Sequence, residues 1–396
     1  NGHNNNFNME KRMTHTIENS NGQLLDLMQK VKDQAERSKD FIAPTNALQI
    51  QTLNKDGSPA DDSDQAKFSR IVVEREDGEP TYMYNANEVA LSQIGQRAGI
   101  DSRTMQRLQQ GYPTQFDSVI NAIWQKEPKN TMIRTFMDSD THGIARAVLS
   151  DKFKTFDNTN LLNSAIPQLM ESEAQWKVVN ADVTDKRLYL RLKSEVITGE
   201  GANRGDLMAS GIGLSNSEVG AGSVQVYQMY WTLACLNGMQ TENRHRQSHI
   251  TSSQADGETW KMLSSEAKDA DNKALELKVR DLVAGYTSRE SFDEVIDKMK
   301  TAGQDVIEGS VNNAVDNLGK VINLTKKETA SVLDGLMATI GQEGYAGNPV
   351  SRATMVNAVT NVANRVDADE MDDWQRRGGQ ILNMNKTDWN RVAVAV

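Results

Sequence analysis

One stretch near the middle of the chain constrains the fold more than any other: LMASGIGLSNSEVGAGSVQVYQMYWTLACLNGM, at residues 207–239. From Val224 to Leu233 almost every side chain is β-branched, aromatic or long and apolar, which is typical of a strand buried on both faces. Glycines at 211, 213, 220, 222 and 238 allow bulges, positive φ angles or close backbone approach. The pattern predicts a long hairpin at the centre of a sheet, with its turn near residues 220–222.

The patterns on either side of this hairpin predict an α+β protein, with a mostly antiparallel sheet within residues 68–250 and helices packed on it. Runs typical of strands lie at 68–75, 131–137, 144–149, 175–183 and 186–193. Helical spacing of apolar residues occurs at 21–40, around 114–126, in the segment ending near Glu171, and repeatedly from 258 to 383. We therefore expect three parts: a polar leader, helix and acidic loop (1–64), an α+β core domain (65–250) and a helical C-terminal region (251–396).

Composition limits the classes of function. The 396 residues carry a net charge of −10, which counts against a protein whose whole surface binds DNA. The single cysteine, Cys235, lies inside the apolar run and excludes a disulfide framework, so a reducing cytoplasm is the expected location. No run approaches the ~20 apolar residues of a membrane span, and the N-terminal NGHNNNFN lacks the apolar core of a signal peptide.

No catalytic constellation is visible in the sequence, so we expect neither an enzyme nor a bound cofactor or metal. The chain contains no Gly-x-Ser-x-Gly elbow and no His-Glu-x-x-His helix. His245 and His249 are four residues apart, but nothing completes a metal set at motif spacing, and two solvated histidines are expected instead. The Gly-rich segment 199–205 lacks the Lys-Ser/Thr of a phosphate-binding loop and precedes a strand rather than a helix.

The strand KRLYLRLK, at residues 186–193, carries a candidate site for nucleic acid. Its alternation places leucines on one face and mostly cationic side chains on the other. Such a face can hold the phosphates of a single strand while a base stacks on an aromatic ring. The competing interpretation is an ordinary surface strand whose charges keep it soluble. The residues expected to contact DNA here, and along the basic stretch after the hairpin, are Arg187, Tyr189, Arg191, Lys193, Arg244 and Arg246.

Residues 87–110, NEVALSQIGQRAGIDSRTMQRLQQ, match the spacing of a helix–turn–helix. Gly95 is the small residue of the first helix, and Gly99 is the turn glycine. A plain pair of helices across a tight turn needs the same apolar spacing, so both interpretations stay open. If the second helix enters the major groove, the side chains that face DNA are Ser102, Arg103, Gln106 and Arg107.

Three segments resemble the phage- and plasmid-like protein family catalogued as domain of unknown function 932. ARAVLSDKFKTFDNTNLLNSAIPQL at 145–169 resembles its strand-"LSDRY"-helix element, YWTLACLNGM at 230–239 is similar to its hairpin with Cys-x-Asn, and TMVNAVTNVANRV at 354–366 is similar to its "NAVT" helix. The resemblance covers about residues 65–390 and implies a mobile-element protein in the cytoplasm of a bacterial host. A fainter similarity to single-strand annealing proteins of the Rad52 type implies strand annealing or recombination, although net acidity and sparse aromatics depart from that pattern.

Three functions follow from these observations. The first is a single-stranded-DNA-binding protein of a mobile element. The second is a non-enzymatic structural or interaction protein of a phage, and the third is a helix–turn–helix regulator. We also expect homo-oligomers, because long strands and an amphipathic helical tail in a chain with 38% hydrophobic residues leave apolar surface for a neighbour to cover.

Overall fold

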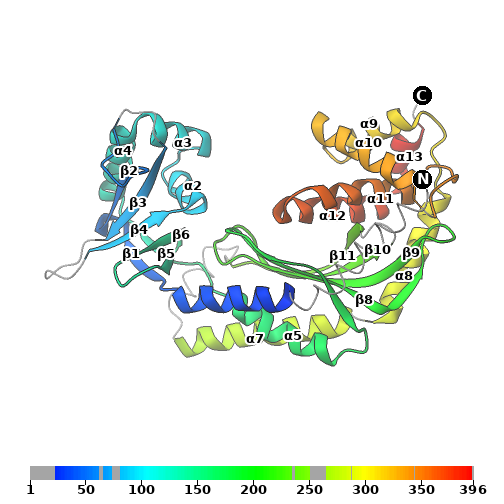
Figure 1. The fold of residues 1–396 in the computed structure, drawn as a ribbon, viewed down its shortest axis with the longest axis horizontal. Helices are drawn as coiled ribbons and strands as arrows, with labels where there is room; N and C mark the ends of the chain where they lie inside the picture. The colour runs from blue at the N-terminus through cyan, green and yellow to red at the C-terminus, as the bar shows by residue number, and fades with distance from the viewer. Residues whose placement is uncertain are drawn as a thin grey trace.

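The computed structural model describes residues 23–61, 66–73, 81–233, 237–249, 265–286, 288–342 and 344–394. Within these ranges the strands form two separate sheets, with helices packed on both (Figure 1). The α+β class and the helical C-terminal region are therefore confirmed. The single sheet expected within residues 68–250 is wrong, because its strands are divided between the two sheets.

Sheet B is built around the predicted hairpin. Its strands follow the order β11 (Asn237–Gln247), β10 (Val224–Thr232), β9 (Leu207–Asn216), β8 (Leu188–Glu200) and β7 (Trp176–Val183), and each neighbouring pair is antiparallel. Every residue of β10 is buried, as its composition predicts. Gly220 adopts a φ of +75° in the loop between β9 and β10. The central hairpin is confirmed, whereas Cys235 lies outside the described residues.

Sheet A is mixed and begins earlier in the chain than expected. Its order is β1 (Phe41–Pro44), β5 (Asn130–Met137), β6 (His142–Ser150), β4 (Tyr82–Ala86), β3 (Lys67–Val73) and β2 (Leu48–Asn54). Strands β4 and β6 pair in parallel, and the other described pairs are antiparallel. Strands β1 and β2 lie in the segment 1–64, where only a leader, a helix and a loop were expected. The three-part division of the chain otherwise stays a prediction.

Three helices pack on one face of sheet A: α2 (Glu88–Arg97), α3 (Ser102–Gly111) and α4 (Pro113–Lys126). Helix α2 begins where Asn87 Oδ1 accepts from the backbone N–H of residue 90, and α3 begins where Asp101 Oδ1 accepts from that of residue 104. The shared core is apolar and contains Tyr84, Ile94, Met105, Phe116, Ile120 and Ile133. This packing holds α2 and α3 in fixed positions on the sheet.

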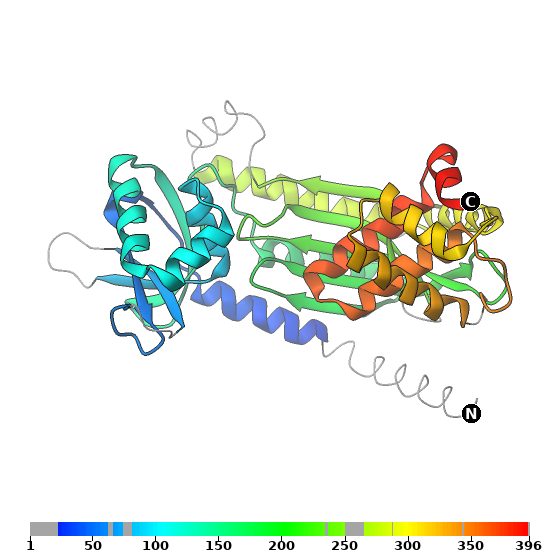
Figure 2. The ribbon, with the colours of Figure 1, turned by 90° about the horizontal axis from the view of Figure 1, so that it is seen from above.

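Helices cover both faces of sheet B (Figure 2). The helix over 23–37, α5 (Asn158–Glu171) and α7 (Ser265–Tyr286) pack on its leucine-rich face. The C-terminal helices, of which α11 and α12 contact the opposite face, are α8 (Arg289–Gln304), α9 (Val311–Val321), α10 (Lys326–Ile340), α11 (Arg352–Val362), α12 (Ala368–Leu382) and α13 (Lys386–Ala393). No helix in the described part of the chain has the length and apolarity that a bilayer crossing requires.

The hairpin loop, residues 217–223, joins the two sheets. Val219 is buried against Leu149 of β6. The backbone carbonyl of Glu218 accepts from Arg134 Nη1 at 2.9 Å, and that of Val219 accepts from Gln93 Nε2 at 2.7 Å. Side chains of β5 and α2 thus bind the loop backbone directly, so the hairpin fixes sheet B to sheet A.

Candidate nucleic-acid interface

Strand β8 follows the predicted alternation, but the face expected to bind DNA is covered. Leu188, Leu190 and Leu192 lie in the core beneath α5 and α7. Tyr189 and Arg191, on the opposite face, have exposed fractions of only 1% and 0%. Helix α12 lies against this face and supplies their partners. The prediction that these two side chains form an accessible surface for single-stranded DNA is therefore wrong.

The acidic side chains of α12 take the place that phosphates were expected to occupy. Tyr189 Oη donates to Asp369 Oδ1 at 3.0 Å. Arg191 Nη1 donates to Asn180 Oδ1 at 2.8 Å, and its Nη2 lies 3.7 Å from Asp372 Oδ1. Burial raises the pKa of Tyr189 above its ordinary value, so the hydroxyl keeps its proton at neutral pH. These groups stabilise the packing of α12 on sheet B rather than present a binding face.

The other cations of the predicted path do not form one accessible surface either. Arg187 is half-buried and donates from Nε to Ala221 O at 3.0 Å. Arg246 is exposed, but its Nε donates to Ser223 Oγ at 2.8 Å. Both side chains therefore donate hydrogen bonds to the hairpin loop.

Lys193 and Arg244 are partly buried. Burial, followed by the charge of the neighbouring Lys177, lowers the pKa of Lys193. Arg244 Nη2 lies 3.8 Å from Asp372 Oδ2, and its guanidinium stands 5.1 Å from the centre of the Tyr227 ring. The carboxylate of α12 that pairs with Arg191 thus also pairs with Arg244.

Two glycines of β9 shape the covered face. A Cβ atom on Gly213 would overlap the ring of Tyr227, and one on Gly211 would overlap Trp231. The indole Nε1 of Trp231 donates to Leu192 O at 3.0 Å across the glycine row. The close approach expected of these glycines is confirmed, because the two aromatic rings lie where side chains would otherwise stand.

Helices α2 and α3 form the expected helix pair. Gly99 adopts a φ of +73° in the turn, a conformation that favours glycine. A Cβ on Gly95 would overlap Met105 of α3, so the small residue allows the two helices to approach closely. The backbone N–H of Ile100 donates to Gly95 O at 2.8 Å and closes the turn. A pair of helices across a tight turn is therefore confirmed, whereas the choice between a DNA-binding helix–turn–helix and a plain helix pair stays open.

The outer face of α3 is open to solvent. Met105 and Gln109 are its buried residues and face the sheet. Gln110, which follows on the outer side, turns back and donates to Lys67 O at 2.8 Å. The open face therefore occupies the first two turns of the helix. All the side chains predicted to face DNA are exposed on it: Ser102, Arg103, Gln106 and Arg107.

The two histidines after the hairpin lie in different surroundings. His249 has an exposed fraction of 3%, with Nδ1 at 2.9 Å from Lys154 O and Nε2 at 2.9 Å from Asn216 Oδ1. The expectation that it is solvated is wrong. His245 lies on β11 rather than on a helix. Among the described residues no group of three or more metal-ligating side chains gathers.

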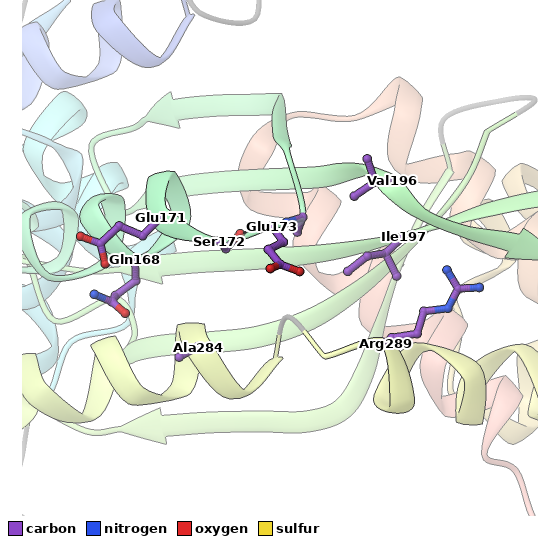
Figure 3. A pocket seen from close by; sticks show the side chains of 9 residues that line it. Gln168, Glu171, Ser172, Glu173, Val196, Ile197, Ala284 and Arg289 are labelled. Atoms are coloured by element: carbon purple, nitrogen blue, oxygen red, sulfur yellow. Dashed lines mark hydrogen bonds between the residues drawn. The ribbon is translucent and has the colours of Figure 1, made fainter.

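An open hollow of about 580 Å³ lies between the end of α5, strand β8 and the start of α8 (Figure 3). Two of the polar side chains that line it, Ser172 and Arg289, have local structural partners. Ser172 Oγ accepts from Trp176 Nε1 at 2.7 Å, and Arg289 Nε lies 3.3 Å from Asp293 Oδ1. Among the described residues that line the hollow, no hydrogen bond joins Ser172 to a neighbouring carboxylate, so we place the functional site on the face of α3 instead.

The fold and its open surfaces define an α+β protein that presents a helix–turn–helix pair beside a second, helix-covered sheet. Comparisons of the chain with family models, with curated proteins and with solved structures find no match. The resemblance to the phage- and plasmid-like family therefore stays an expectation.

Proposed function

We propose that this protein binds DNA through the α2–α3 pair, with α3 in the major groove. The supporting observation is the exposure of Ser102, Arg103, Gln106 and Arg107 on one face of a helix that the sheet A core holds in place. Arginine pairs with guanine O6 and N7, glutamine pairs with adenine N6 and N7, and a serine hydroxyl contacts phosphate. The open face of α3 therefore carries side chains for both base and backbone contacts.

Accessibility favours α3 over strand β8. The sequence predicts a DNA-binding surface on both strand β8 and helix α3. Tyr189 and Arg191 of β8 are buried beneath α12, whereas Arg103 and Arg107 of α3 are exposed to solvent. Phosphate neutralisation requires cations that DNA can reach, since the attraction arises from releasing counterions that surround the phosphates. The proposal therefore moves DNA contact from sheet B to the helices of sheet A.

The net charge of −10 limits how much non-specific electrostatic attraction the protein can have for DNA. A negatively charged protein gains less from non-specific attraction, so we expect few phosphate contacts and an affinity for duplexes of arbitrary sequence that is measurable at low salt, with base contacts adding preference for some sequences. Homo-oligomerisation stays a prediction. If it occurs, two α3 helices are expected to read half-sites about one helical turn of DNA apart.

The test is a fluorescence anisotropy titration of the full chain with a mixed-sequence duplex and with a single strand of the same length, at low salt. We expect the duplex to bind more tightly than the single strand, and Arg103→Ala with Arg107→Ala to weaken duplex binding at least tenfold. Arg204→Ala is the matched control, because Arg204 is an exposed arginine on the β8–β9 loop of sheet B. If the α3 variant binds the duplex as tightly as wild type, α3 does not contact DNA and the proposal is refuted.

A structural or interaction protein is the second candidate, and the covered face of sheet B supports it. Arg191 and Arg244 pair internally with Asp372, so these charges stabilise the fold. This candidate predicts no affinity for either form of DNA, even at low salt. If the protein instead prefers single strands and the α3 variants leave that binding unchanged, single-stranded-DNA binding at a surface other than strand β8 would be the better account.

A further inference from the structure

A cavity of about 160 Å³ lies where the two sheets meet. One wall is the face of sheet A that carries Phe136, Ile144 and Arg146. The other is the turn over residues 183–187 between β7 and β8, and Glu218 of the hairpin loop lies at the junction. The cavity is therefore formed by parts of the chain that only the docking of the two sheets brings together.

Arg146 enters the cavity from a β-bulge. Arg134 pairs with Ala147 and Thr135 pairs with Ala145, so Arg146 is the extra residue on β6. A bulge of this kind re-aims one side chain and is over-represented near binding sites. The guanidinium of Arg146 stands 4.1 Å from the centre of the Phe136 ring.

Part of the hydrogen-bonding capacity of Arg146 is unused. Its side chain is 8% exposed, and its Nη2 donates to Glu218 Oε2 at 2.6 Å. Its Nε is buried and has no hydrogen-bond partner among the described residues. A buried donor without a partner costs about 1–3 kcal/mol, so Arg146 keeps unused donor capacity beside the cavity that its side chain lines.

Arg187 faces the same cavity from the opposite wall. Its guanidinium donates to a neutral carbonyl, Ala221 O, and no carboxylate in the described part of the chain forms an ion pair with it. Three cations, Arg146, Lys186 and Arg187, and two acids, Asp185 and Glu218, line the cavity, which gives the described lining a net charge of +1. Arg146 pairs with Glu218, and Lys186 Nζ lies 4.0 Å from Asp369 Oδ2, so the excess of positive charge beside the apolar surface rests on Arg187.

We propose that this cavity binds a small oxyanion, a phosphate or a short-chain carboxylate, with its charged group between Arg146 and Arg187. At about 30 Å³ per water molecule, the cavity has room for about five waters. Typical pockets for drug-sized ligands begin at about 300 Å³, so this cavity is too small to enclose an intact nucleotide or a DNA strand. Asn87, the N-cap of α2, also lines the cavity, so an occupant would touch the first helix of the proposed DNA-binding pair.

Isothermal titration calorimetry of the full chain with inorganic phosphate, and separately with malonate, tests the proposal without DNA. We expect one saturable site for at least one of the two probes and a higher melting temperature in its presence. Arg187→Gln removes the charge but keeps a donor for Ala221 O, and we expect it to weaken binding at least tenfold. Arg204→Gln makes the same change at an exposed position outside the cavity and should leave binding unchanged.

Lys186→Gln is the second variant, since Lys186 has an exposed side chain (58%) and its loss should not disturb folding. We expect it to weaken binding about two- to threefold, because a lysine at the rim attracts the anion without enclosing it. Absence of saturable binding by both probes would overturn the proposal. So would unchanged affinity in Arg187→Gln or, if that variant does not fold, in Lys186→Gln.

Discussion

Asp372→Asn should destabilise the protein far more than the same change one residue later. The Asp372 side chain is 5% exposed and accepts from Gln240 Nε2 at 2.6 Å. It lies 3.7 Å from Arg191 Nη2 and 3.8 Å from Arg244 Nη2. Each charge pair at this separation is worth about 4 kcal/mol at an effective dielectric constant near 20, and the cost of desolvating the carboxylate offsets part of that sum. Removing one partner of a buried pair usually costs about 3–5 kcal/mol, which is the loss we expect.

Asp373→Asn is the matched control, because it removes the same charge from the next position of α12. The Asp373 side chain is 55% exposed and pairs with Arg376, which is itself 47% exposed. Exposed pairs contribute about 0–1 kcal/mol, so this variant should unfold almost like wild type. Urea unfolding at pH 7, followed by tryptophan fluorescence, measures both variants. If Asp372→Asn and Asp373→Asn both cost less than about 1 kcal/mol, α12 does not enclose Arg191, and the covered-face account fails.

Two further variants test a close contact within β9 and a buried carboxylate just before it. Gly213→Ala should destabilise the protein by about 1–3 kcal/mol, because its Cβ would overlap the Tyr227 ring. Gly285→Ala in α7 is the control, because its Cβ would meet no neighbouring atom, and it should not destabilise the protein. Thermal unfolding of both variants measures the difference. Asp206→Asn should stabilise the protein at pH 7. Burial raises the pKa of Asp206, so the folded protein keeps this proton to a higher pH than the unfolded chain, which releases it above about pH 4. The free energy of unfolding of the wild type therefore falls as the pH rises through this range. The asparagine can still accept from Tyr345 Oη, and its advantage in urea unfolding should shrink as the pH falls toward 4; an advantage independent of pH would contradict the assignment.

Local pattern was enough to predict the elements that the chain forms with its own neighbours in sequence. The run from Val224 predicted β10 because composition alone identifies a strand buried on both faces. The spacing of Gly95 and Gly99 predicted the α2–α3 turn because a tight helix pair needs small residues at those positions. The period-two pattern of LQIQTLN, residues 48–54, is a local signal for β2 that the expected leader, helix and loop did not include.

Contacts between distant segments are where prediction from the sequence failed. The alternation of β8 correctly separated the leucines from Tyr189 and Arg191, but it did not reveal what covers the second face. That cover comes from Asp369, which is 180 residues away from Tyr189 in the chain. Two acids near the start of a helix are typical of ordinary N-terminal charges, so nothing local marked Asp369 and Asp372 as partners. The bulge at Arg146 likewise depends on the pairing of β5 with β6.

The most direct test of DNA binding through α3 is the salt dependence of duplex affinity, measured for wild type and for the double variant Arg103→Gln with Arg107→Gln. Each arginine that neutralises a phosphate contributes about 0.9 to the slope of log K against log salt concentration. We therefore predict that the double variant binds at least tenfold more weakly, with a slope flatter by about 1.8 if both side chains contact phosphate and by about 0.9 if one of them contacts a base. A double variant that retains both the affinity and the slope of wild type, or a wild-type protein without duplex affinity at low salt, would contradict this account.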